Sequence, residues 1–85
     1  VMMARINAVT DRSNKAYTEF RRYFGQSNMC SAARTYVDIV SKERDKLTAL
    51  AGSIRSGTKV GDHYTKTLNS INETLNAVRS ALGRC

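Results

Sequence analysis

Apolar residues recur at alternating spacings of four and three positions along three stretches of this chain. On an α-helix a mean spacing of about 3.5 residues places the side chains in one stripe, whereas on a β-strand it would scatter them over both faces. The pattern therefore predicts three amphipathic helices whose stripes are buried against one another. The third stripe is unbroken and the other two carry one polar residue each: Met2, Ile6, Val9, Ser13, Ala16, Phe20 and Tyr23; Met29, Ala33, Tyr36, Val40, Glu43, Leu47, Leu50 and Ile54; and Tyr64, Leu68, Ile71, Leu75, Val78, Leu82 and Cys85.

We expect these helices at about residues 2–24, 29–55 and 62–82 of a single domain that covers residues 1–85. Helices of this length span about 33–40 Å, and the connections between them are short. Short connections make consecutive helices antiparallel neighbours. The expected fold is all-α, an antiparallel up-down-up three-helix bundle that stands alone or forms part of a four-helix bundle.

Capping residues set the expected helix ends. Gly25 follows the first helix and Gly57 the second, and glycine tolerates the left-handed conformation that often ends helices. Ser27 or Asn28 can cap the second helix. The carboxylate of Asp62 is expected to accept hydrogen bonds from backbone N–H groups at the start of the third.

Glu43 stands on the second stripe, where a carboxylate is costly to bury without a partner. Arg12 and Lys15 are expected at a comparable height on the preceding antiparallel helix. We expect Glu43 to pair with one of them or to face solvent at the edge of the seam. A catalytic role for this carboxylate is the alternative.

Basic residues outnumber acidic ones, with 14 Lys and Arg against 7 Asp and Glu and a formal net charge of +7. This surplus suggests an anionic partner, either a nucleic acid, a lipid head group or an acidic protein face. A merely solvated surface is the alternative, because the basic residues are spread over all three helices. The chain begins with Val1, so we expect a removed leader or further residues upstream. No apolar run approaches the roughly 18–20 residues of a membrane span.

Cys30 and Cys85 are the only two cysteines. In an up-down-up arrangement the start of the second helix and the end of the third lie at the same end of the bundle. A disulfide between them is therefore geometrically feasible and would indicate an oxidising compartment. Two small buried hydrophobic side chains are the other interpretation, and the sequence leaves both open.

Catalysis generally needs several titratable groups at one place, and this chain has a single histidine, His63. No Gly-rich phosphate loop, nucleophile elbow or paired-carboxylate motif is present. Zinc would need ligands from separate helices in an unfamiliar spacing. We expect a surface role for His63, no enzyme, no cofactor and no metal site.

Binding is the remaining class of function, and two forms of it fit the sequence. A basic helical domain can contact nucleic-acid phosphates, although no short recognition helix follows a tight turn here. The other form is an interaction module that docks on a larger assembly through aromatic side chains. Exposure of two or more of these rings would favour docking, whereas burial of the rings would mean that they only close one end of the hydrophobic core. Its candidate contacts combine the aromatic and arginine side chains that are enriched at interfaces: Tyr17, Phe20, Arg21, Arg22, Tyr23 and Phe24.

Three short patterns resemble the small lumenal assembly and repair protein family of photosystem II. They are Asn14 followed by Phe20-Arg21-Arg22, then Val60-Gly61-Asp62, and the closing Ala81-Leu82-Gly83-Arg84. Members of that family are four-helix bundles, and the resemblance spans about three-quarters of the chain. One helix fewer is predicted here, and the family's prolines and N-terminal lipid-bearing cysteine are not present.

The resemblance implies a non-catalytic protein of the thylakoid lumen that docks on a photosystem, with Arg21 and Arg22 as candidate contacts. We therefore expect a small basic accessory subunit or assembly factor that binds a larger, membrane-embedded complex. A respiratory complex is an equally permissible host. The alternative function is a nucleic-acid-binding helical domain.

Overall fold

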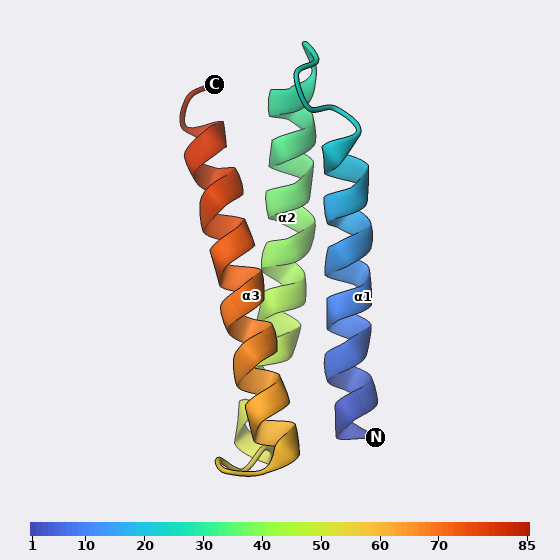
Figure 1. Cartoon of the computed structure of the whole chain (residues 1–85), viewed down its shortest axis with the longest axis vertical. Coiled ribbons are helices and arrows are strands. Elements are labelled where there is room, and N and C mark those ends of the chain that lie inside the picture. The colour runs from blue at the N-terminus through green and yellow to red at the C-terminus, as the bar shows by residue number, and fades with distance from the viewer.

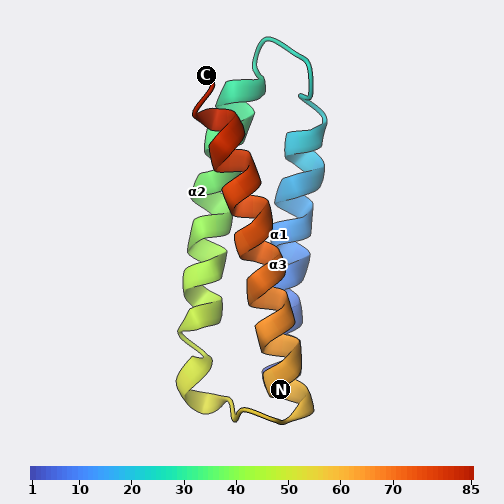
Figure 2. The ribbon, with the colours of Figure 1, turned by 60° about the vertical axis from the view of Figure 1, so that its left-hand side comes forward.

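The computed structural model describes all 85 residues and consists of three α-helices without strands. They are α1 (Met2–Arg21), α2 (Met29–Thr48) and α3 (Lys59–Leu82), and a short 3-10 turn, η1 (Ala51–Ser53), precedes α3. The prediction of an all-helical chain is confirmed. Figures 1 and 2 show the helices lying side by side. The molecule extends 44 Å along its longest axis.

The two connections lie at opposite ends of the molecule (Figures 1 and 2). The C-terminus lies beside the connection from α1 to α2, and the N-terminus lies near the connection from α2 to α3. The end that holds the C-terminus is called the upper end below, and the opposite one the lower end.

The buried core comes entirely from the three predicted stripes. Each fully buried aliphatic side chain contributes about 1.5–3 kcal/mol relative to leaving it in water, so these stripes provide most of the driving force for folding. The core residues are Ile6, Val9 and Phe20 on α1, Ala33, Tyr36, Val40 and Leu47 on α2, and Ile71, Leu75 and Val78 on α3.

The first helix ends at Arg21, three residues before the predicted end at Phe24. Beyond it the backbone tightens into turns, with Tyr23 N–H donating to Phe20 O and Phe24 N–H to Arg21 O. Such i to i+3 bonds commonly finish a helix because its last carbonyl groups lack i+4 partners. Gly25 then takes the expected left-handed conformation, with φ of 74°.

The second helix ends at Thr48, well before the predicted end at Arg55. Gly52 and Ser53 are poor helix formers, and the backbone there forms η1. Ile54 still packs against the core, so the apolar spacing continues after the α-helix has stopped. At the other end of α2, Asn28 is the N-cap residue but its side chain makes no capping bond.

The third helix begins at Lys59 and is capped by Thr58, so the assignment of the cap to Asp62 is wrong. Thr58 Oγ1 accepts a hydrogen bond from Gly61 N–H at 2.9 Å, which is the usual N-cap geometry. Asp62 lies in the first turn instead, where its charge still suits the helix dipole. A Cβ at position 61 would collide with the carbonyl oxygen of Arg55, so the connection can close over α3 only where glycine stands.

Candidate functional site

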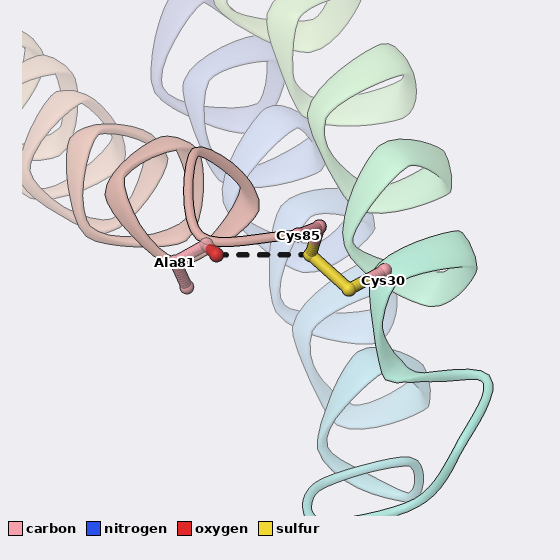
Figure 3. Close-up of a disulfide and its surroundings, with 3 residues drawn as sticks. All are labelled: Cys30, Ala81 and Cys85. Carbon is pink, nitrogen blue, oxygen red and sulfur yellow. Dashed lines mark hydrogen bonds between the residues drawn. A yellow bond between two sulfur atoms is a disulfide. The ribbon is translucent and has the colours of Figure 1, made fainter.

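A disulfide joins Cys30, at the start of α2, to Cys85, three residues beyond α3 (Figure 3). The Cα atoms are 6.0 Å apart, and the structure contains no free cysteine. Cys85 Sγ also lies 3.7 Å from Ala81 O, which is a van der Waals contact because a disulfide sulfur carries no proton to donate. The bridge fastens the end of α3 to α2 at the upper end of the molecule.

The predicted aromatic residues lie together at the upper end, where one ring is buried, two are half-buried and one is exposed. Phe20 is buried, its ring centroid lying 5.0 Å from that of Phe24 and 5.7 Å from that of Tyr36. Tyr17 and Tyr23 are half-buried, and Phe24 alone is exposed, at 54%. One ring rather than two is therefore exposed, and the cluster mainly closes the core.

Two arginines of the predicted contact set lie on the surface beside these rings. The guanidinium carbon of Arg21 lies 5.9 Å from the ring centroid of Tyr17, which is within cation–π range. Arg22 pairs with Glu19 at 3.6 Å, and both side chains are more than half exposed. An exposed pair of this kind contributes little to stability, so Arg22 can exchange it for another anion.

Positive charge gathers at the upper end to a degree that the sequence analysis missed. Residues 20–37 and 74–85 contain no Asp or Glu, because all seven acidic residues of the chain lie outside these two segments. These two segments hold five of the 14 basic residues, all arginine, and are called the arginine end below: Arg21, Arg22, Arg34, Arg79 and Arg84. The sequence does carry a signal for this cluster of positive charge. It is the pair of segments without Asp or Glu, which the topology brings to the same end of the molecule.

Two hollows follow one another along the contact between α1 and α3, and together they are called the groove below. The upper part, of about 560 Å³, is lined mainly by hydrophobic residues, and the lower part, of about 240 Å³, is lined mainly by polar residues. The upper part is lined by Tyr17, Phe20, Phe24, Gly25, Met29, Glu73, Thr74, Ala77, Val78 and Ala81. The lower part is lined by Thr10, Ser13, Asn14, His63, Lys66, Thr67, Ser70 and Ile71.

His63 marks the lower limit of this groove. Its Nε2 lies 2.7 Å from Asn7 Oδ1, a hydrogen bond that ties α3 to α1. Ser13, by contrast, is buried with no hydrogen-bond partner for its hydroxyl group. Of the polar residues that line the lower part, Ser13 is thus the one whose side-chain oxygen is both buried and without a hydrogen-bond partner.

Glu43 is buried on the seam and paired, as one of the sequence predictions has it. Arg12 Nε donates to its Oε1 at 2.6 Å and Lys46 Nζ to its Oε2 at 3.1 Å, whereas Lys15 takes no part. Burial raises the pKa of Glu43, but the hydrogen bonds from Arg12 and Lys46 outweigh it and hold the pKa below its usual value. A carboxylate held ionised by two cations is a structural feature, not a proton donor poised for catalysis.

The structure contains no group of three or more His, Cys, Asp or Glu side chains arranged to hold a metal ion. None of the three helices combines the length and hydropathy needed to cross a lipid bilayer. Comparisons with family models, curated proteins and solved structures found no match.

Proposed function

We propose that this protein is a non-catalytic, basic accessory subunit or assembly factor that docks through its arginine end on a larger, membrane-embedded complex. The observation that carries the proposal is the set of five arginines, of which Arg22 alone forms an ion pair, together with the exposed Phe24 and a mainly apolar groove. Its scaffold is an antiparallel up-down-up three-helix bundle, which becomes part of a four-helix bundle when a partner helix joins it.

Docking proceeds in two stages on this proposal. The surplus of positive charge first steers the arginine end toward an acidic surface. Phe24 and the apolar part of the groove are then buried in the contact, which provides the lasting affinity. The disulfide holds α2 and α3 together at this end beforehand, so that less conformational entropy is lost on binding.

The resemblance to the lumenal photosystem II family favours a photosystem as the host complex and the thylakoid lumen as the location. A disulfide is consistent with such an oxidising compartment. It is equally consistent with an oxidising compartment that adjoins a respiratory complex. One part of the resemblance does not extend to structure. Where the family has proline, Gly61 uses its N–H to complete the Thr58 cap, which proline cannot do.

Charge reversal tests the docking proposal. The double variant Arg21→Glu/Arg22→Glu should lose co-purification with the host complex while its circular dichroism stays helical. The matched control is Arg5→Glu/Lys59→Glu, which changes the same charge at the lower end and should co-purify normally. Unchanged co-purification of the Arg21/Arg22 variant would contradict the proposal.

Nucleic-acid binding is the second candidate, because the same arginine end could contact phosphates. It predicts an affinity for single- or double-stranded oligonucleotides that falls steeply as salt rises. Filter binding or fluorescence anisotropy at low ionic strength decides the matter, and absence of binding there rules this function out.

A further inference from the structure

The groove between α1 and α3 has the form of a seat for one more helix. Its α1 wall repeats at spacings of four and three through Thr10, Asn14 and Tyr17 toward Arg21, and Phe24 continues the wall just beyond the end of α1. The facing wall of α3 repeats similarly through Lys66, Ser70, Thr74, Ala77 and Ala81. Two such rows on neighbouring helices form the kind of channel into which the ridge of a third helix packs.

Size and side-chain volume agree with this form. From Thr10 to Arg21 the groove follows α1 for about 16 Å at 1.5 Å per residue, and Phe24 extends its wall beyond the end of α1, so a helix of at least about 11 residues fits. Ala77 is exposed and Ala81 half-buried, and these small side chains let a second backbone come close. The aromatic rings of Tyr17 and Phe24 form the opposite wall, against which aliphatic side chains can pack.

The chemistry along the groove sets which helix fits. Its upper part requires apolar side chains, whereas its lower part presents the exposed polar side chains of Asn14 and Ser70 to a hydrogen-bonding one. Arg21 lies over Tyr17 at the rim of the upper part, where a carboxylate of the occupant would meet it. Glu73 lines the α3 side, so a cation on the occupant is favoured at that point.

We propose that this groove binds an amphipathic helix of a partner protein, with acidic residues on the flank that faces Arg21 and a hydrogen-bonding side chain facing Asn14 and Ser70. The inference rests on the proposed function and names the chemistry of the partner. A second copy of this chain fits poorly, since each copy carries a net charge of +7 and would bring another basic surface to the rim.

Three synthetic peptides of 18 residues test the proposal against the whole oxidised chain. The first carries a leucine stripe flanked by glutamates, with one serine in the stripe; the second has lysine in place of each glutamate. The third contains the residues of the first in scrambled order. Affinity is measured by fluorescence anisotropy, and the binding surface is mapped from amide chemical shifts of the isotopically labelled protein.

We expect the glutamate peptide to bind at least about tenfold more tightly than either of the others, with shifts confined to the facing walls of α1 and α3. Ala77→Gln fills the groove and should weaken binding about tenfold or more. Ala4→Gln makes the same change at an exposed position of α1 outside the groove and should leave binding unaltered. Arg21→Gln should reduce the preference for glutamate over lysine.

Equal binding of the three peptides, shifts on the outer face of α2, or no effect of Ala77→Gln would each overturn the inference. So would a dimer of the free protein in sedimentation, or tighter binding of an oligonucleotide at the same residues. Co-purification with the host complex separates this failure from that of the proposed function. If the Ala77→Gln variant still co-purifies with the host complex while the Arg21→Glu/Arg22→Glu variant does not, the proposed docking function holds and the groove is not the docking site.

Discussion

Reduction of the Cys30–Cys85 bridge should cost this protein a large share of its stability. The bridge links residues 55 positions apart, and closing a loop of that length removes about 4 kcal/mol of conformational entropy from the unfolded chain at 25 °C. Domains of this size are stable by only about 5–15 kcal/mol in total. With about 4–8 °C in melting temperature per kcal/mol, reduction should lower the Tm by roughly 20 °C.

The assay is thermal unfolding followed by circular dichroism at 222 nm, with and without a phosphine reductant, after thiol titration has shown that the bridge is intact or open. The double variant Cys30→Ala/Cys85→Ala is the control. It should melt near the temperature of the reduced protein and should not respond to the reductant, because no other cysteine is present.

The reasoning fails if fully reduced protein, with two titratable thiols, melts within about 3 °C of the oxidised form. That result would mean that the unfolded chain already holds the two ends close together, so that the bridge removes little entropy from it. A Tm loss that also appears when the reductant is added to the double-alanine variant would assign the effect to the reagent.

Two substitutions on the seam give further predictions. Ser13→Ala removes a buried hydroxyl group that has no hydrogen-bond partner, so it should raise the free energy of unfolding in urea by about 1–2 kcal/mol. The control, Ser70→Ala at an exposed helical site, should gain only about 0.5 kcal/mol from helix propensity. Equal gains in the two variants would contradict the idea that burying the Ser13 hydroxyl group costs stability. Glu43→Gln loses its charge-assisted bonds to Arg12 and Lys46 and should cost about 1–3 kcal/mol at pH 7. Because the folded state lowers the pKa of Glu43, its contribution is present above the unfolded pKa of about 4.3 and is lost as the pH falls through the folded value, so the two proteins should converge toward pH 3. A constant difference between pH 7 and pH 3 would contradict this origin.

The sequence predicted the helices and their core well because the apolar spacing directly states which side of each helix is buried. It also named Arg12 and Lys15 as possible partners for Glu43, because short connections leave little freedom in the relative height of consecutive helices, and the structure pairs Glu43 with Arg12. The ends of the helices were less predictable. Whether a stripe that reaches Ile54 stays α-helical or tightens at Gly52 depends on how the connection packs.

The candidate site was only partly predictable. The residues Phe20 to Phe24 were correctly placed at one end, but how far each ring is buried depends on the angle at which α1 meets α2. That Arg34 and Arg84 lie at the same end of the molecule as Arg21 could be recognised only from the topology, because these arginines are far apart in sequence. The walls of the groove combine stripe residues with residues beside the stripes, such as Thr74 and Ala77, and they are defined only once α1 and α3 are packed.

The glycine in the first turn of α3 implies an unusual evolutionary constraint. Most positions in such a connection tolerate substitution. Replacing Gly61 by alanine, however, would place a methyl group where the main chain of Arg55 lies and would displace it. Descendants of this gene should therefore change its neighbours freely while retaining Thr58-x-x-Gly61 together with the two bridged cysteines. Such a sparse signature would identify distant kin better than overall identity does.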